Sequence, residues 1–397
     1  MTNFKRISFF FFILLQSACQ SPAPETDQAN KEETEATFSF NWEAIADKLL
    51  ERMDLQAGER VMMVGKPGVF DPLVPLLRMR IAAAQAEDLG VFSVTDTAPE
   101  GWGSAFVEGS KGMNREQMVA YFQDVDLGIM LPGAVPSDLP YGAMQDLLWQ
   151  NRGRTIHFHW TGAYTLNGLV RPVDDEINAF YQKVLLETNY AGLKKAQKMF
   201  ETAMRGQTIR VTTPLGTDIS FQIGDRPVTK QDGDASAAHT NQGRNLIDRE
   251  VELPAGAIRV APIETSVEGK IAFPDSDWNG TQVEGLVLNF SAGKVTEWTA
   301  TSGKEAVEAV FKEKGKVAQS FREFALGMNP MLAIQGSDNP WIPYYGYGGG
   351  VVRLSLGNNA ELGGNVTDGD FVRWNFFTDA TVKVGDDVWV QDGKLIQ

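Results

Sequence analysis

The sequence is poor in the residues that most metal and redox sites need. Its 397 residues include one cysteine and three histidines. A single cysteine cannot close an internal disulfide, and it has no second thiolate with which to hold a metal ion. The chain also lacks a phosphate-binding G-x-x-x-x-G-K loop, a G-x-G-x-x-G motif after an expected strand and a G-x-S-x-G nucleophile turn. These absences exclude the common signatures of nucleotide-binding proteins and serine hydrolases.

Basic residues are also in short supply relative to acidic ones. Asp and Glu number 51 against 36 Lys and Arg, which gives a formal net charge of −15. Nucleic acid is therefore not expected as a partner, because binding its phosphates requires an excess of Lys and Arg. Hydrophobic residues make up 43% and charged residues 22% of the chain, as in an ordinary globular protein. The length allows two domains.

Only the start of the chain carries a long apolar run. Lys5 and Arg6 precede an apolar stretch over residues 7–15, which is too short to cross a bilayer as a helix. The stretch leads into Q-S-A-C, ending at Cys19, and the whole segment resembles a bacterial lipoprotein signal. The resemblance implies a signal peptide over residues 1–18 and a lipid attached to Cys19. A plain secretory signal with an incidental cysteine is the alternative.

Residues 19–37 contain many Glu and almost no large apolar side chain. Such a segment cannot bury a core, which predicts a disordered acidic tether between the lipid anchor and the folded protein. The protein is therefore expected at the bacterial cell envelope, held there by its lipid anchor.

Residues 38–206 alternate between two hydrophobic periods. Apolar residues recur at helical spacing over residues 42–54, 73–89, 114–123 and 144–150. Short apolar runs typical of buried strands lie at residues 60–64, 91–94, 126–131 and 154–160. Asn114 is a suitable N-cap, and a long helical stretch is expected over residues 176–205. This order predicts an N-terminal α/β domain over residues 38–206, with a parallel sheet wrapped by helices.

The hydrophobic period changes to two after Gly206. Residues 208–212 and 218–223 flank a P-L-G-T turn, which predicts a β-hairpin. Short strands and glycine-rich turns continue to the end of the chain, interrupted by one expected helix over residues 304–326. The chain is therefore predicted to be an α/β protein with a β-rich C-terminal domain over residues 207–397.

One stretch of this second half combines charge with apolar residues. Residues 370–379, D-F-V-R-W-N-F-F-T-D, alternate as a strand. Arg373 and Asn375 would then share one face with Phe371 and Phe377. A permanent charge on that face predicts either an edge strand with one wet face or a functional site.

Five blocks of sequence carry a resemblance to a known family. They are residues 55–61 (L-Q-A-G-E-R-V), 253–262 (L-P-A-G-A-I-R-V-A-P), 321–330 (F-R-E-F-A-L-G-M-N-P), 349–357 (G-G-V-V-R-L-S-L-G) and 370–379. Taken in order, they resemble the aminopeptidase T / aminopeptidase S family of metallo-aminopeptidases. The similarity runs over most of the chain and implies the metallopeptidase fold of that family.

The resemblance also implies a two-metal site in the C-terminal domain, where carboxylates and imidazoles share two cations and a nucleophilic water. Glu323 retains one of six ligand positions of the family. The other positions are substituted, and Ala360 replaces the catalytic tyrosine of the family; the five substituted ligand positions are Ala257, Gly348, Arg353, Arg373 and Asn375.

Arginine has no lone pair to offer a cation at neutral pH, so these substitutions predict a protein without a metal cofactor. Arg353 and Arg373 are both expected within reach of Glu323. Two guanidinium groups near one carboxylate predict either a salt-bridge network that fills the vacated site or a binding site for an anion. Asn375 and His239, which lies in a polar loop before residue 253, complete the ligand-binding candidates.

Other polar residues leave further hypotheses open. A divalent metal such as Zn or Co could be held by replacement ligands, with Glu323, Asp368, Asp370 and His239 as candidates. His157 and His159 share one face of an expected strand, a spacing that can chelate metal. Polar residues at the end of a strand are the favoured interpretation of that pair. The aromatic and glycine-rich residues 341–350 predict either a packed surface loop or a wall for an organic ligand.

Three functions follow from these patterns. The first is a lipid-anchored protein whose degenerate aminopeptidase site binds a small anionic or peptide-like ligand and which meets the membrane only through its lipid. The second is an active metal-dependent aminopeptidase, and the third is a structural scaffold. The family resemblance implies a homodimer for each of them.

Overall fold

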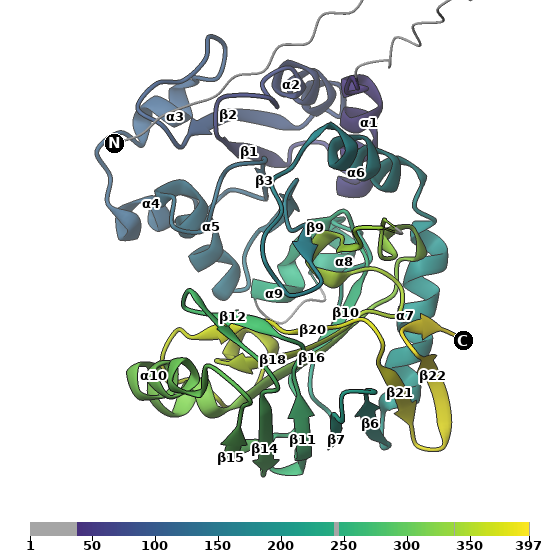
Figure 1. Cartoon of the computed structure of the whole chain (residues 1–397). Helices are drawn as coiled ribbons and strands as arrows, with labels where there is room; N and C mark the ends of the chain where they lie inside the picture. The colour runs from purple at the N-terminus through teal and green to yellow at the C-terminus, as the bar shows by residue number, and fades with distance from the viewer. Residues whose placement is uncertain (1–37, 242–245, 337, 397) are drawn as a thin grey trace, which may run out of the picture. The chain divides into compact units, whose positions relative to one another are not determined.

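The computed structural model of the chain describes residues 38–241, 246–336 and 338–396 (Figure 1). The predicted signal peptide, the predicted lipidation site Cys19 and the predicted acidic tether lie outside the described residues. In the part that is described, no helix combines the length and the apolar composition needed to cross a membrane.

A five-stranded parallel sheet forms the centre of the N-terminal half, in the order β2-β1-β3-β4-β9. Its strands are β1 (Arg60–Gly65), β2 (Glu87–Ser93), β3 (Leu127–Met130), β4 (Arg154–Phe158) and β9 (Glu250–Leu253). The strands β3 and β4 are buried throughout, as expected for a parallel sheet covered on both faces.

Helices cover this sheet on both faces (Figure 1). They are α1 (Trp42–Met53), α2 (Leu73–Ala83), α3 (Ala105–Gly109), α4 (Arg115–Tyr121), α5 (Leu139–Trp149) and α6 (Asp175–Glu187). The next helix, α7 (Tyr190–Met204), packs against strands of the C-terminal half. Alternate residues of β1 serve the two faces. Val61 and Met63 pack into the cluster that includes α1, α2 and α6, whereas Met62 and Val64 pack with α4 and α5. Asn114 caps α4 in a reciprocal capping box with Gln117.

The predicted long helix over residues 176–205 is in fact two helices. α6 ends at Glu187, and the side chain of Asn189 accepts a hydrogen bond from the backbone of Gly192 to start α7. Asparagine competes for backbone donors in this way at helix N-termini, so it interrupts a pattern that hydrophobic spacing alone reads as continuous.

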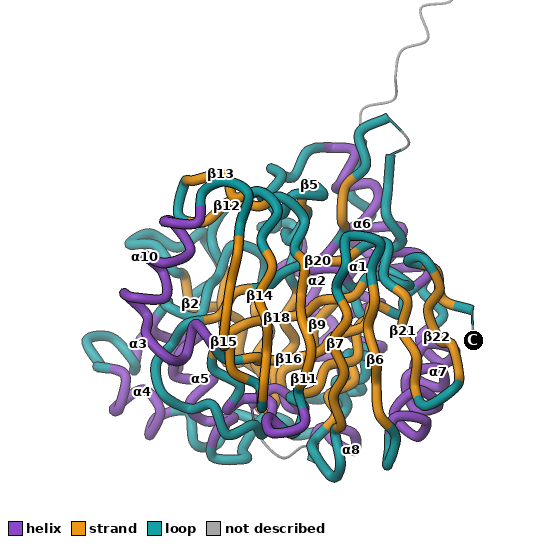
Figure 2. The backbone as a smooth tube through the Cα atoms, turned by 60° about the horizontal axis from the view of Figure 1, so that its bottom comes forward, coloured by secondary structure: helices purple, strands orange, loops and turns teal. Residues whose placement is uncertain are grey.

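Two antiparallel sheets form the C-terminal half. The strands of the first, in the order β19-β18-β16-β10-β8 with β20 also paired to β18, are β8 (Val228–Lys230), β10 (Ala257–Val260), β16 (Phe321–Gly327), β18 (Val352–Gly357), β19 (Val372–Arg373) and β20 (Phe376–Phe377). The strands of the second are β6 (Thr208–Thr212), β7 (Asp218–Gln222), β11 (Glu268–Ala272), β14 (Val287–Ser291), β15 (Lys294–Thr299), β21 (Thr381–Val384), β22 (Asp387–Gln391) and β23 (Lys394–Leu395). Figure 2 shows β15, β14, β11, β7, β6, β21 and β22 side by side as one layer. The predicted fold class, α/β with a β-rich second half, is confirmed.

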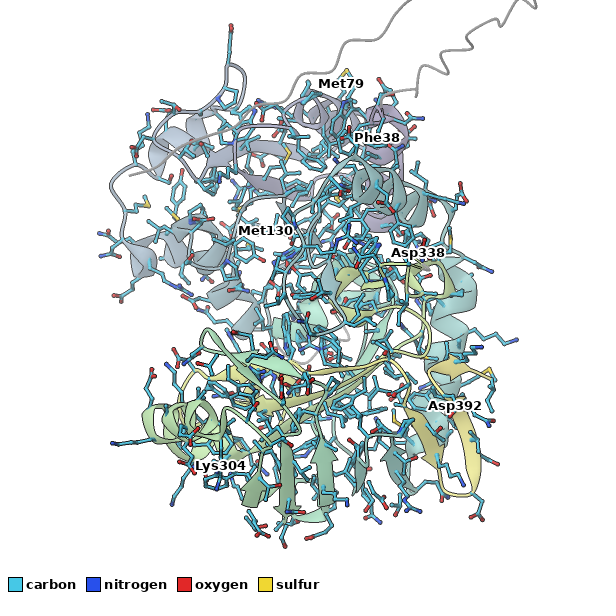
Figure 3. All side chains as sticks on the ribbon, in the orientation of Figure 1. Phe38, Met79, Met130, Lys304, Asp338 and Asp392 are labelled. Carbon is cyan, nitrogen blue, oxygen red and sulfur yellow. The ribbon has the colours of Figure 1, made fainter. Side chains whose placement is uncertain are left out.

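Short elements complete the fold. Two small two-stranded sheets pair β12 (Ser276–Trp278) with β13 (Thr281–Val283), and β5 (Tyr164–Thr165) with β17 (Trp341–Ile342). Two short helices, α8 (Ala237–Thr240) and α9 (Leu246–Arg249), precede β9. Side chains fill the interior: Met130 of β3 is buried, whereas Met79 of α2 is exposed (Figure 3).

The predicted helix over residues 304–326 is wrong in its second half. α10 spans Lys304–Lys314 and is followed by a 3-10 turn, Gly315–Gln319, and then by β16. Every residue of β16 is buried, because the strand lies between β10 and β18 in the sheet. Because both faces of β16 are buried and it also carries Arg322 and Glu323, its apolar and polar residues do not alternate, and hydrophobic periodicity does not identify it as a strand.

The strand predicted over residues 370–379 is interrupted. β19 and β20 are separated by Trp374 and Asn375, although both strands pair with β18. The change from helices to antiparallel strands begins at β6, yet β9 returns to the parallel sheet of the N-terminal half. Phe38–Gln397 forms one compact unit.

Candidate functional site

The first antiparallel sheet brings the family-derived positions together. Ala257, Glu323, Arg353 and Arg373 stand on four consecutive strands, β10, β16, β18 and β19. In the register of this sheet, Arg259 and Arg353 both pair with Ala325 of β16. Residues two apart on a strand share a face, so Glu323 lies on the same face as the two arginines.

Glu323 is the centre of a buried ionic network. It is 0% exposed, and both of its oxygens are engaged. Oε2 accepts hydrogen bonds from Arg259 Nε at 3.2 Å and Nη2 at 2.9 Å. Oε1 accepts from Arg353 Nε at 2.9 Å and from the Ser355 hydroxyl at 3.2 Å. A carboxylate held in this way has no free oxygen to offer to another ligand.

A third arginine extends the network. A bulge in β16 shifts the register between Phe321 and Glu323, which places Arg322 Nε 3.9 Å from Glu323 Oε2. Arg322 also donates to Glu361 and to the carbonyl of Asn358. Glu361 accepts a further hydrogen bond from Arg259 Nη2 at 3.3 Å. The network thus contains three arginines and two glutamates.

The charges in the network decide its protonation. Burial acts to raise the pKa of Glu323, but the charges of Arg259 and Arg353 outweigh it and hold that pKa well below its usual range. Burial likewise acts to lower the pKa of Arg259, but the charge of Glu323 raises it well above its usual value. The groups therefore stay ionised because each compensates the other.

The residues at this position do not fit a pair of metal ions. The carboxylate of Glu323 is already occupied by guanidinium groups, and a dication would be repelled by their charges. Ala257 offers no donor atom. At Gly348 a side chain would meet the carbonyl of Leu332 at 1.9 Å from its Cβ, so the backbone leaves no room for a ligand there. Ala360 lies at the start of a 3-10 turn, Ala360–Leu362.

The charged partner that sequence reasoning missed is Arg259. It lies in the block over residues 253–262, between Ile258 and Val260. A charge inside an otherwise apolar strand was the available signal. Its meaning depends on the register between β10 and β16, which the sequence does not disclose.

Arg373 does not join Arg353 at Glu323, contrary to expectation. Its Nε donates to Asn375 Oδ1 at 3.1 Å, and its Nη2 donates to the carbonyl of Asp277 at 2.9 Å and to Ser276 Oγ at 3.3 Å. The guanidinium group lies over the ring of Trp278, with Cζ 3.8 Å from the ring centroid. The hairpin formed by β12 and β13 thus holds Arg373 apart from the network.

Asn375 and Trp374 connect the two arginines. The Asn375 amide donates to the carbonyl of Leu354 at 3.0 Å while its oxygen accepts from Arg373. The Trp374 ring covers Arg353, and the Cζ atom of Arg353 lies 4.8 Å from the centroid of that ring. Trp374 is 37% exposed, whereas its neighbour Asn375 is buried.

The aromatic residues 341–350 lie against the network. The carbonyl of Tyr345 accepts a hydrogen bond from Arg353 Nη1 at 3.1 Å. The Tyr345 hydroxyl lies 3.1 Å from His159 Nδ1, and the Tyr347 hydroxyl donates to Glu252. These tyrosines separate the Glu323 network from the ends of β4 and β9.

His157 and His159 lie where those two parallel strands end. His157 Nε2 is 3.3 Å from Glu250 Oε1, which also accepts from Gln145 at 3.1 Å. Burial, followed by the charge of His159, lowers the pKa of His157 well below its usual value. Burial raises the pKa of Glu250 to about 8, although the hydrogen bond from Gln145 opposes the shift. Glu250 is therefore a protonated acid at neutral pH, in contrast to Glu323.

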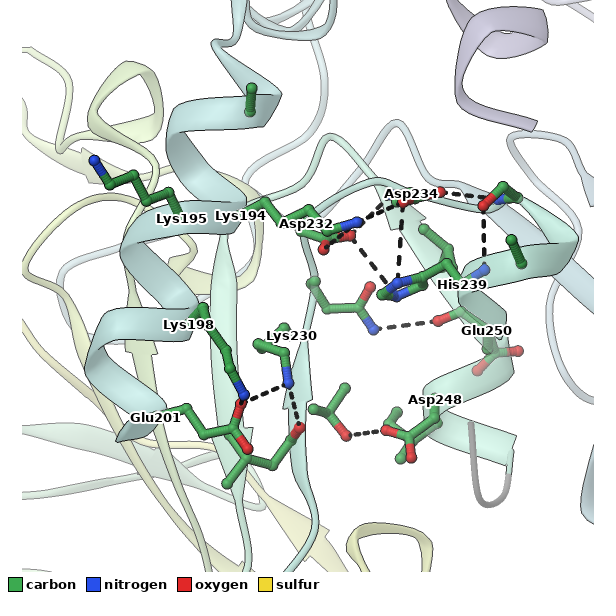
Figure 4. Close-up of a pocket in the computed structure, with 18 of the residues that line it drawn as sticks. Lys194, Lys195, Lys198, Glu201, Lys230, Asp232, Asp234, His239, Asp248 and Glu250 are labelled. Carbon is green, nitrogen blue, oxygen red and sulfur yellow. Dashed lines mark hydrogen bonds and ion pairs between the residues drawn. The ribbon is translucent and has the colours of Figure 1, made fainter. Parts of the chain in front are cut away.

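His239 faces a cavity of about 910 Å³ between α7, β8 and the segment leading to β9 (Figure 4). Its Nε2 lies 3.9 Å from Asp232 Oδ1 and its Nδ1 4.0 Å from Asp234 Oδ2. Lys194 forms an ion pair with Asp234 at 2.7 Å. The cavity reaches Glu250 but is not lined by Glu323.

The replacement metal ligands are not brought together. Asp368 and Asp370 are exposed in a turn after β18, whereas His239 lines the large cavity. Across the described residues, no three His, Cys, Asp or Glu side chains are arranged to hold a metal ion.

Residues 187–337 match the family described as thermophilic metalloprotease (M29). The matched stretch includes β10 and β16 but ends before Arg353 and Arg373. No curated protein matches the chain.

The fold is similar to that of wild-type AmpT from Thermus thermophilus. The two structures share 15% sequence identity with a TM-score of 0.59, over 90% of this chain and 99% of AmpT. A C-DES mutant with glycine linked to its PLP cofactor aligns over 30% of this chain and 28% of its own, at 14% identity and a TM-score of 0.18, which carries no argument. The chain is thus a metallopeptidase-like protein, and the predicted resemblance to the aminopeptidase T / aminopeptidase S family is confirmed.

Proposed function

We propose that this protein has kept the metallopeptidase fold but binds a small anionic or peptide-like ligand without a two-metal centre. The observation that carries the proposal is the state of Glu323, whose two carboxylate oxygens are occupied by Arg259, Arg353 and Ser355. A metal ion would have to displace charge-assisted hydrogen bonds and then sit beside three guanidinium groups.

The active aminopeptidase is the weaker candidate. It needs several acidic or imidazole ligands around one point, whereas His239 belongs to a different cavity and Asp368 and Asp370 are exposed in a turn. No specific contact of the described residues favours it.

Metal analysis tests the proposal. Protein purified without chelator, and then dialysed against equimolar Zn²⁺ or Co²⁺, should contain less than stoichiometric metal by plasma mass spectrometry. It should not release amino acids from peptides under the same conditions. The matched variant Glu323→Gln should show the same metal content as the wild type. Two metal ions per chain that are lost in Glu323→Gln would contradict the proposal and favour the aminopeptidase.

The cellular setting is part of the same proposal. Cleavage before Cys19 and lipid on that residue would hold the folded unit at the cell envelope through a flexible tether. Mass spectrometry of the mature N-terminus and membrane fractionation of Cys19→Ala test this. A wild-type protein without lipid, or a variant that fractionates identically to a lipid-bearing wild type, would contradict it. The homodimer is tested by light scattering of the folded unit, for which a single-chain mass would be the contrary result.

A further inference from the structure

A second cavity, of about 290 Å³, is lined by both Arg373 and Trp374. Its polar lining includes Arg373, Asn375 and Ser276, and its apolar lining includes Leu169, Val170 and Trp374. This volume is at the lower end of the range for small-molecule sites, and it suits a ligand of a few heavy atoms. Since Trp374 also covers Arg353, the cavity adjoins the position of the family's metal centre.

Arg373 has hydrogen-bonding capacity to spare in this cavity. Its Nε and Nη2 donate to Asn375, Ser276 and the Asp277 carbonyl, and none of these bonds uses Nη1. All three acceptors are neutral groups. Burial lowers the pKa of Arg373 to about 10, even though the nearby charge of Asp277 acts to raise it. The guanidinium group is oriented and partly desolvated, and none of these three hydrogen bonds goes to a carboxylate.

The apolar side of the cavity is unusually exposed. β5 and the turn after it place Leu169 at 49% and Val170 at 71% exposure. Trp374 lines the same cavity and is 37% exposed. Large apolar side chains scattered singly on a surface are ordinary, but a group of them beside an oriented charge is typical of a binding site.

We infer that this cavity binds a small carboxylate with an apolar chain. The carboxylate accepts hydrogen bonds from Arg373, and the chain packs between Val170, Leu169 and Trp374. The inference rests on the proposed function and names the class of its ligand. A free alkyl carboxylate and an apolar amino acid share this chemistry.

Two aspartates in the lining limit the charge of the ligand. Asp277 Oδ1 accepts a hydrogen bond from the backbone of Gly280 at 3.0 Å, and Asp275 is exposed at the rim. Their negative charges oppose a dianion such as phosphate, whereas a single carboxylate needs only the one cation that Arg373 supplies. They do not oppose the ammonium group of an amino acid.

Calorimetric titration with four probes tests the inference. The probes are 4-methylpentanoate, leucine, the neutral 4-methylpentanamide and inorganic phosphate. At least one of the two carboxylates should bind, and both the amide and phosphate should bind about tenfold more weakly or not at all. Equal binding of the amide and its carboxylate, or no binding of either carboxylate, would overturn the inference.

Variants locate the binding. Arg373→Met should weaken the bound carboxylate about tenfold to a hundredfold, since it removes a charge-assisted pair of hydrogen bonds. The control Arg60→Met removes another arginine that lies over an aromatic ring, that of Phe106 with Cζ 5.4 Å from the centroid, and should leave binding unchanged. Val170→Asp adds a negative charge at an exposed position, so it should weaken binding about fivefold or more without affecting folding. Full affinity in both Arg373→Met and Val170→Asp would place the ligand elsewhere and overturn the inference.

The two hypotheses fail in different ways. Stoichiometric metal bound through Glu323 would contradict the proposed function, even if Arg373-dependent carboxylate binding were found. A metal-free protein whose carboxylate binding does not depend on Arg373 would contradict the inference alone.

Discussion

The buried network around Glu323 and the cavity beside Arg373 both contain arginine, but the arginines differ in whether a carboxylate balances their charge. In the network, each arginine faces a carboxylate, and both oxygens of Glu323 are engaged. Beside the cavity, Arg373 donates through Nε and Nη2 only to neutral acceptors. A compensated buried charge contributes to structure, whereas an oriented charge without its counter-ion is available to a ligand. Glu323 and Arg373, at two positions where the family resemblance predicts metal ligands, thus differ in whether an ion pair compensates their charge.

Removing the central carboxylate should break the comparison most strongly. Glu323→Gln leaves Arg353 buried without an anion and leaves Arg259 with only the hydrogen bond to Glu361, which should lower the free energy of unfolding by about 3–5 kcal/mol. Guanidinium denaturation at pH 7 measures this, with the exposed Glu297→Gln as a control that should change stability by less than about 0.5 kcal/mol.

The triple variant Arg259→Met, Glu323→Leu, Arg353→Met removes the charges together and should recover most of the lost stability. If it is as unstable as the single variant, the loss comes from packing and not from uncompensated charge.

A pH series sharpens the comparison through Glu250, which is as buried as Glu323 but lacks an arginine partner. Its pKa is raised from 4.5 to about 8, so the folded state holds a proton that the unfolded state releases between these values. Stability from this group is therefore complete below pH 4.5 and is lost as the pH rises toward 8, by up to about 1.4 kcal/mol per pH unit.

Glu250→Gln should flatten the dependence of unfolding free energy on pH between 5 and 8, as measured by urea denaturation. For Glu323, whose pKa is lowered, the sign is opposite: its stabilisation is present above pH 4.5 and is lost as the pH falls below that value. Identical pH profiles for the wild type and Glu250→Gln would contradict the assignment of a neutral Glu250.

Trp374 belongs to both regions, so its removal should affect both moderately. Trp374→Ala exposes Arg353 to water and removes one wall of the 290 Å³ cavity. We expect a loss of about 1–2 kcal/mol in the free energy of unfolding, from the cation–π contact and partial burial of the ring. Carboxylate binding should weaken in the same protein. Trp374→Phe is the matched control, and a variant with unchanged stability but lost binding would show that the ring serves the ligand alone.

The smallest effect is expected at Val170. Because its side chain is 71% exposed, Val170→Ser should change the free energy of unfolding by less than about 0.5 kcal/mol. The same change should weaken the binding of 4-methylpentanoate about threefold, since it removes apolar contact area from the ligand. Thermal unfolding and calorimetry on one sample separate the two effects. An unchanged affinity would remove this residue from the apolar wall.

The fold class could be predicted from the sequence because hydrophobic period and chain order report it directly. The hairpin of β6 and β7 and the cap at Asn114 were visible for the same reason, since each depends on residues close in the chain. β16 was misread as helix because burial on both faces erases its alternation. Hydrophobic periodicity predicts a helix or strand where one face is exposed, and it fails where every side chain is buried.

The site was predictable only in part. The contact between Glu323 and Arg353 followed from the resemblance, since it maps both residues onto one site. The role of Arg259 depends on which residue of β16 lies beside it, and that of Arg373 depends on the hairpin at Ser276 and Asp277, about a hundred residues away. Strand register and long-range pairing come from tertiary packing, which a single sequence does not encode in any short pattern.

The strands β9 and β10 are joined only by Pro254–Gly256, and they belong to different sheets. A linker of three residues limits how far one sheet can move away from the other. The tyrosine contacts between residues 341–350 and the ends of β4 and β9 add lateral ties. The two halves should therefore melt together, in a single calorimetric peak whose van't Hoff and measured enthalpies agree. Surface turns such as that at residues 165–169 would then have to move to admit a ligand, on a timescale of nanoseconds to microseconds.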